Sequence, residues 1–206
     1  IRRWDADFRI IPIKSGHAVN FSYNEDREIR DIAGAARERN DFKGAVMFKQ
    51  AAGKSYFEQA VEMFRNDRDS YYSGGGVIEG YRLSAGLRQQ VESNELSGAV
   101  SYRRADAESG ERSKIYSASA SSRIQVVQRG ELRSSVEVYH QTLDNLSGEP
   151  SFLLTDNRPG KDGAIWSVSL RYGIKGGMRV NFSLSGRHSD DRTARVTGRG
   201  EFVAGF

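Results

Sequence analysis

The chain of 206 residues has no cysteine, only three prolines and no long hydrophobic run. Without cysteine, disulfide frameworks, thiolate metal sites and cysteine nucleophiles are all excluded. The longest apolar stretches fall far short of the ~18 residues that a membrane-spanning helix needs, and the mean hydropathy is -0.62. The length predicts one domain over residues 1–206. Because the chain starts at Ile1 and not at methionine, we expect that a leader or an upstream domain precedes it.

Strict alternation of apolar and polar residues is the main pattern of the C-terminal half. Even positions from 164 to 174 carry Ala, Trp, Val, Leu, Tyr and Ile, and odd positions are mostly polar. A Lys-Gly-Gly turn at 175–177 precedes a second alternating segment at 178–187, and a third closes the chain at 196–206. Period two is the signature of a β-strand with two different faces. The 22 glycines fit a β protein with tight turns.

The same pattern recurs toward the N-terminus with decreasing clarity. Further strands are predicted at 42–50, 56–65, 77–90, 96–103, 115–128 and 132–142. Two more are predicted around Phe8 and Phe21, and 28–37 is a further strand or a short helix. The total is about twelve strands.

Short and long connections alternate along this series of strands. The longest is 144–162, which holds Pro150 and Pro159, whereas several others are tight glycine turns. Short turns at one end and longer loops at the other are typical of an antiparallel, up-and-down transmembrane β-barrel, with both termini then on the periplasmic side. Pro12 fits poorly, because a closed barrel has no free edge. A soluble up-and-down barrel and a β-sandwich are the alternatives.

The last seven residues, Gly-Glu-Phe-Val-Ala-Gly-Phe, end an alternating strand on an aromatic residue. This ending resembles the C-terminal strand signal of bacterial outer-membrane β-barrel proteins. The resemblance implies that Phe202 and Phe206 form an assembly signal, that the barrel-assembly machinery and the lipid bilayer are partners, and that the protein resides in the bacterial outer membrane. In size the chain is similar to small twelve-stranded monomeric porins, such as the oligogalacturonate and sialic-acid channel family, although no diagnostic motif links it to them.

The polar faces of the later strands are rich in arginine and poor in acids, with only Glu137 and Glu201 opposing the arginines. If the apolar faces meet lipid, the arginines line the interior and favour anions, which predicts a channel for small anionic solutes. The alternative is that the arginines pair with acids in a plugged barrel, which would serve a structural role or bind other envelope proteins through loop 144–162. The predicted lining residues are Arg82, Arg88, Arg103, Arg123, Arg133, Arg171, Arg179, Arg195 and Arg199, with Arg187 on the same face.

Other functions have little support in the sequence. His140 and Thr142 place an imidazole and a hydroxyl on one strand face, but a serine nucleophile and an orienting third group are missing. Neither the Asp67–Asp69 nor the Asp190–Asp191 cluster has the spacing of a calcium loop. The arginines are interleaved along strands, so the pI of about 9.4 does not indicate nucleic-acid binding. We therefore expect no enzyme, no metal, no cofactor and no nucleic-acid partner.

Overall fold

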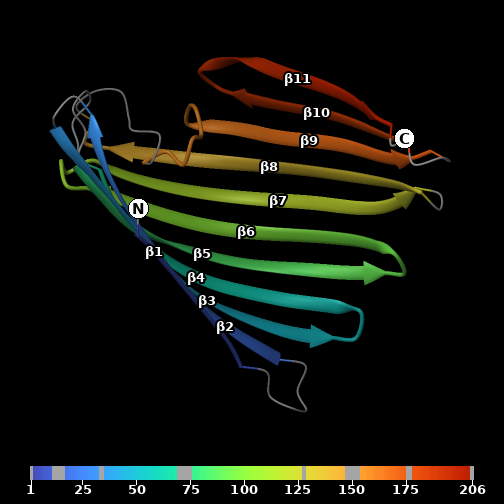
Figure 1. Cartoon of the computed structure of the whole chain (residues 1–206), viewed down its shortest axis with the longest axis horizontal. Coiled ribbons are helices and arrows are strands. Elements are labelled where there is room, and N and C mark those ends of the chain that lie inside the picture. Colours follow the sequence, from blue (N-terminus) through green and yellow to red (C-terminus); the bar gives the residue numbers. More distant parts are fainter. Residues whose placement is uncertain are drawn as a thin grey trace.

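The protein forms a single curved antiparallel sheet in a computed structural model (Figure 1). The structure describes residues 2–10, 17–32, 35–68, 76–126, 129–146, 154–174 and 178–204. These residues form eleven β-strands. Within the described ranges, no helix is long and apolar enough to cross a membrane.

The strands are long, and most exceed the apolar stretches that predicted them. They are β1 (Arg2–Ile10), β2 (His17–Ile32), β3 (Ala35–Ala52), β4 (Ser55–Arg68), β5 (Gly76–Val91), β6 (Asn94–Ala107), β7 (Arg112–Val126), β8 (Gly130–Asp144), β9 (Asp162–Gly173), β10 (Arg179–Ser189) and β11 (Arg192–Val203).

About twelve strands were expected, and the described residues form eleven. The extra strand or helix expected at 28–37 is not a separate element, because Ile32 ends β2 and Ala35 begins β3. Its charged residues belong to extensions of two long neighbouring strands. The described residues form an odd number of antiparallel strands. The first residue of β1, Arg2, and the last residue of β11, Val203, therefore lie at opposite ends of the sheet. This corrects the expectation that both termini share the periplasmic side.

Each strand pairs only with its sequence neighbours, in the order β1 to β11. Among the described residues β1 and β11 do not pair with each other, so the sheet is not closed. These two strands run in the same direction, because ten antiparallel pairings separate them. A direct seam between them would therefore be parallel, whereas antiparallel closure requires an odd number of further strands.

The two ends of the sheet differ in their connections. We call the end with the turns at 53–54 and 92–93 the turn end, and the opposite end, with 108–111 and 145–161, the loop end. Between the alternating segments predicted at 178–187 and 196–206, the connection is only a two-residue turn, Asp190–Asp191, because β10 reaches Ser189 and β11 begins at Arg192. The longer of these connections thus lie at the loop end, although that end also contains a two-residue turn.

Alternation gives the sheet two chemically different faces. Paired residues on neighbouring strands point to the same side, so the register defines an inner face carrying Arg82 and Arg103 and an outer face carrying Val100 and Val138. The outer face is apolar and exposed: Val100 is 59% and Val138 52% accessible. Large apolar side chains open to the surroundings on one face are expected where a sheet meets lipid. The inner face is polar.

A small apolar cluster lies at the loop end of the inner face. Ile78 of β5 and Ala105 of β6 are buried against Leu154, which follows β8 in the long connection. Leu154 is fully buried, and removing a leucine side chain from water contributes about 1.5–3 kcal/mol. The connection therefore packs on the sheet at this point.

Candidate functional site

A row of charged side chains crosses the inner face near its loop end. Register places Glu62 of β4 opposite Arg82 of β5, and Arg82 opposite Arg103 of β6. Lys43 of β3 extends the row, with its Nζ 2.9 Å from Glu62. The row brings together side chains from four strands.

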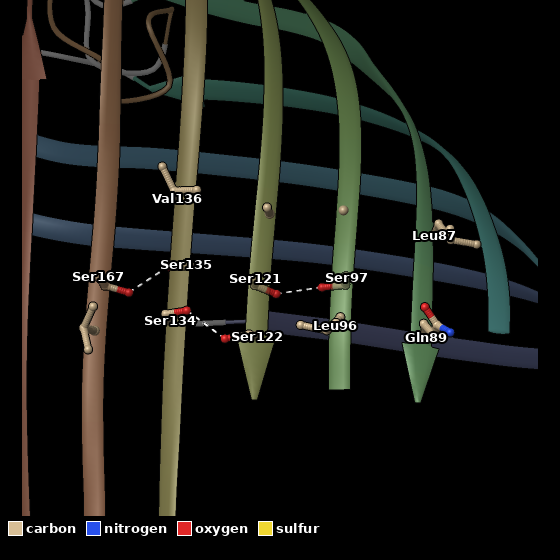
Figure 2. A pocket seen from close by; sticks show the side chains of 13 residues that line it. Leu87, Gln89, Leu96, Ser97, Ser121, Ser122, Ser134, Ser135, Val136 and Ser167 are labelled. Atoms are coloured by element: carbon tan, nitrogen blue, oxygen red, sulfur yellow. Dashed lines mark hydrogen bonds between the residues drawn. The ribbon is translucent and has the colours of Figure 1, made fainter. Parts of the chain in front are cut away.

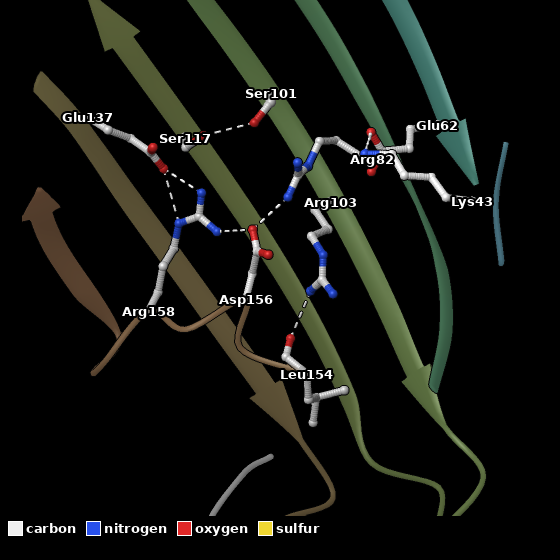
Figure 3. Close-up of polar contacts among 10 residues, drawn as sticks. All are labelled: Lys43, Glu62, Arg82, Ser101, Arg103, Ser117, Glu137, Leu154, Asp156 and Arg158. Carbon is white, nitrogen blue, oxygen red and sulfur yellow. Dashed lines mark hydrogen bonds and ion pairs between the residues drawn. The ribbon is translucent and has the colours of Figure 1, made fainter. Parts of the chain in front are cut away.

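Segment 154–161 lies on this row (Figure 3). Arg82 donates from Nη2 to Oδ2 of Asp156 at 2.6 Å. Arg103, which is 5% exposed, donates from Nη1 to the carbonyl oxygen of Leu154 at 2.9 Å, and its guanidinium lies 4.5 Å from the ring centre of Phe64. Two of the predicted lining arginines therefore hold a loop segment against the sheet.

Arg158 fixes the second half of the segment. Its Nε and Nη2 donate to Oε1 of Glu137 on β8 at 3.0 and 2.5 Å, and its Nη1 donates to Asp156. The side chain of Arg158 is 11% exposed, and its charge is balanced by two carboxylates. Tyr139, the next inner-face residue of β8, donates from its hydroxyl to the carbonyl oxygen of Pro159. The segment thus narrows the inner space with contacts to three strands.

The predicted arginines nearer the turn end have carboxylate partners of their own. Arg123 and Arg133 both bind Glu131, at 2.6 Å each. Arg88 lies 3.5 Å from Glu95 and 3.9 Å from Glu58. These contacts are at least partly exposed to solvent, where an ion pair contributes at most about 1 kcal/mol. These ion pairs are therefore weak and leave the charged groups accessible to solvent.

The remaining four predicted arginines lie on the last three strands. Arg171, Arg179, Arg195 and Arg199 are exposed on the inner face of β9, β10 and β11. Within the described part of the chain, none has a carboxylate within 4.0 Å. Glu131 of β8 is the register partner of Arg171 but binds Arg123 and Arg133, and Glu201 accepts from Nδ2 of Asn181 at 3.3 Å. This part of the inner face therefore carries an excess of positive charge.

Between the two charged ends, the inner face is lined by small hydroxyl side chains. Register aligns one such residue from each of β6 to β11: Ser97, Ser121, Ser135, Ser167, Ser185 and Thr197. The hydroxyls of Ser97 and Ser121 are 2.6 Å apart, and those of Ser135 and Ser167 are 2.7 Å apart (Figure 2). Such short side chains leave space at mid-height and offer polar atoms to water.

The aromatic residues divide between the two faces. Tyr139 and Phe64 face inward, and Tyr81, Tyr102 and Tyr116 contact one another on the outer face, with ring centres 5.9 and 5.0 Å apart. Phe202 of the predicted assembly signal is 60% exposed. Phe206 lies outside the described residues.

His140 has a partner that the sequence did not reveal. Its Nδ1 lies 2.7 Å from Oδ1 of Asp162 on β9. Thr142 is two residues further along β8, about 7 Å away at strand spacing, beyond the reach of a nucleophile–base hydrogen bond. The pair therefore lacks the geometry of a catalytic triad.

Arg158 and Asp156 are the main contact residues that sequence reasoning missed. Neither lies on an alternating strand, so period two carries no information about them. The only signal was the length of loop 144–162, which left open a loop that folds inward.

No protein-family model matches the chain, and no curated protein matches its sequence. The structure is similar to a loop L8 deletion mutant of OmpT, an outer-membrane protein of Vibrio cholerae, with a TM-score of 0.63 and 10% identity over 96% of this chain and 61% of that one. It is also similar to CdiB from Acinetobacter baumannii, with a TM-score of 0.54 and 11% identity over 91% of this chain and 40% of that one.

The fold is that of bacterial outer-membrane β-barrel proteins. This confirms the predicted class and agrees with the predicted outer-membrane localisation. The chain spans less than two thirds of the length of either structure.

Proposed function

We propose that the protein is an outer-membrane channel that passes small solutes and prefers anions. The observation that carries the proposal is the asymmetry of charge on the inner face. Arg171, Arg179, Arg195 and Arg199 have no carboxylate within 4.0 Å among the described residues. Arginine remains charged at every relevant pH and binds carboxylate or phosphate oxygens two at a time. A positive lining raises the local concentration of anions and repels cations.

The nine arginines of the prediction then divide into groups with different roles. Arg82 and Arg103 hold segment 154–161 against the inner face, so their proposed role is to set the shape of the pore. Arg88, Arg123 and Arg133 share carboxylates near the turn end, and their net contribution to the field is small. Arg171, Arg179, Arg195 and Arg199 supply the selectivity.

A passage also needs space and a closed wall. The row of serines at mid-height provides room and hydrogen-bonding groups for a hydrated solute. In a bilayer the edges β1 and β11 must find partners, since unpaired backbone groups cost several kcal/mol each in hydrocarbon. The proposal refers to the protein with its wall completed.

The second candidate is a plugged barrel with a structural or partner-binding role. Segment 154–161 supports it, because it lies over the inner face and is held there by Arg158 and by the buried Arg103. In either case we propose no enzymatic activity. Single-channel recording from the folded protein in planar bilayers separates the two candidates. Discrete openings with an anion-selective reversal potential in a KCl gradient support the channel, and the absence of any opening supports the plugged barrel.

A further inference from the structure

A tight turn in segment 154–161 presents a carboxylate to the inner face of the sheet. The backbone N–H of Arg158 donates to the carbonyl oxygen of Thr155 at 3.0 Å and closes the turn. Its central residues, Asp156 and Asn157, have φ angles of 53° and 60°. These are the left-handed values of a type I′ turn, which aspartate and asparagine adopt more readily than most residues. The local sequence therefore sets the backbone from which the side chain of Asp156 reaches the sheet.

The carboxylate of Asp156 lies between two arginines (Figure 3). Its Oδ2 accepts one hydrogen bond from Nη2 of Arg82, at 2.6 Å, and another from Nη1 of Arg158. In the described part of the chain, no other carboxylate lies within 4.0 Å of Arg82. Register places Arg103 directly opposite Arg82, and like charges in such positions destabilise a sheet. Two guanidinium groups that converge on one oxygen atom are a binding site for a carboxylate, and the chain fills this site with its own side chain.

The site is open to solutes in the inner space. The side chain of Arg82 is 31% exposed and that of Asp156 is 34% exposed. Both line the same cavity, whose volume is about 1210 Å³ with the open mouth included. The Nε and Nη2 atoms of Arg158 are held by Glu137, so this guanidinium stays in place when Asp156 leaves. A solute carboxylate that enters the cavity therefore meets the same pair of donors.

We propose that Arg82 and Arg158 bind the carboxylate group of a solute, and that Asp156 occupies this site as an internal competitor when no solute is bound. The solute accepts the two hydrogen bonds in place of Asp156, whose side chain turns away and loosens the turn. A tethered competitor lowers the apparent affinity, because the site is free for only a fraction of the time. Weak binding suits a passage that the solute must leave again. The site shares no residue with the four arginines of the proposed ion preference, so the inference goes beyond that proposal and applies to a plugged barrel as well.

Removing the internal competitor tests the proposal. Asp156→Gly takes away a group of the size and shape of acetate, and glycine accepts the left-handed backbone at this position. Saturation-transfer NMR of the refolded protein in detergent, titrated with acetate, measures the affinity. We expect Asp156→Gly to bind acetate about tenfold more tightly than the native protein. Phosphate and chloride, added as competitors, should displace acetate only at higher concentrations, because neither has the planar shape of a carboxylate. Adding Arg82→Gln to Asp156→Gly should abolish the gain.

Two variants of the same turn are the controls. Asp156→Asn keeps a side chain of the same size in the site and should gain less acetate affinity than Asp156→Gly. Asn157→Gly keeps the carboxylate and the left-handed backbone, and should leave the affinity unchanged. Retained heat-modifiable electrophoretic mobility shows that each variant is folded. In the native protein, acetate should accelerate hydrogen exchange at the Arg158 amide, which closes the turn, and chloride at the same ionic strength should not.

Four results would overturn the proposal. They are equal acetate affinity in the native protein and Asp156→Gly, tighter binding of phosphate than of acetate, a gain that survives Arg82→Gln, and equal exchange of the Arg158 amide in acetate and chloride. Binding and exchange are measured without ion flow. Each of these results therefore leaves the reversal potential, and hence the proposed channel function, to be judged on its own.

Discussion

Arg158 donates two hydrogen bonds to a single carboxylate oxygen of Glu137, at 3.0 and 2.5 Å. The contact joins the segment after β8 back to the inner face of β8 itself. Arg158 is 11% and Glu137 29% exposed, so solvent screens this pair less than a surface ion pair. Segment 154–161 is therefore part of the inner wall, and its position determines how much of the interior stays open.

Glu137→Gln should release this segment. The substitution removes the negative charge and leaves Arg158 only Asp156 as a charged partner. Breaking a fully buried ion pair costs about 3–5 kcal/mol, and the partial exposure of Glu137 makes the cost smaller here. We expect faster hydrogen exchange at the backbone amides of segment 154–161 and a larger single-channel conductance. Glu201→Gln, an inner-face acid bonded to Asn181, is the control. Unchanged exchange and conductance in Glu137→Gln would refute the role of the pair.

Gly163→Ala should disturb the same segment from another direction. A Cβ at Gly163 would overlap the ring and hydroxyl of Tyr139, whose hydroxyl binds Pro159. Displacing the ring costs about 1–3 kcal/mol, as overpacking does. Gly200→Ala on β11 is matched, because nothing lies within 4 Å of the added carbon. Urea unfolding followed by gel mobility should show a lower midpoint for Gly163→Ala alone. Equal midpoints would contradict the packing described.

Neighbouring residues of β8 test which face meets lipid. Val136 is 44% exposed on the outer face, and Ser135 belongs to the inner row of hydroxyls. Val136→Arg should lower the free energy of unfolding in liposomes by about 2–4 kcal/mol, the cost of arginine at the bilayer midplane. Ser135→Arg should cost far less. The reverse order would mean that the faces have been assigned the wrong way round.

The Asp190 turn should loosen in acid. Backbone hydrogen bonds, first that of Asp162 and also that of Lys161, lower the pKa of Asp190 below its ordinary value of 3.8. A lowered folded pKa means that the stabilisation is fully present above the unfolded pKa and is lost as pH falls through the folded value. The protection factors of the Lys161 and Asp162 amides, which correct for the intrinsic pH dependence of exchange, should then fall as the pH is lowered. Asp190→Asn should weaken protection at neutral pH, and Glu108→Gln, in another turn, should not. Uniform behaviour of all three proteins would contradict this.

The strands could be predicted because alternation follows directly from a sheet with one face toward lipid and one toward water. At 164–174 every even side chain is apolar, and β9 forms there. Alternation did not predict the strands at 28–37, because β2 and β3 continue there through charged residues that show no apolar face. It also missed the two-residue turn at Asp190–Asp191, since the charged stretch around it looks like a loop.

The candidate site could be predicted only in part, for a related reason. Parity placed Arg82 and Arg103 on one face, and the register agrees. Their partners Asp156 and Leu154 come from a segment 74 and 51 residues away in sequence, and no periodicity encodes such contacts. That the arginines contact anions stays a prediction.

The most direct test of the central claim is the reversal potential in a KCl gradient, compared between the native protein and the variant with Arg171→Gln, Arg179→Gln, Arg195→Gln and Arg199→Gln. We predict an anion-selective potential for the native channel and a shift toward cation selectivity in the variant, with openings retained. A cation-selective native channel, or the same anion-selective potential in both proteins, would contradict the account.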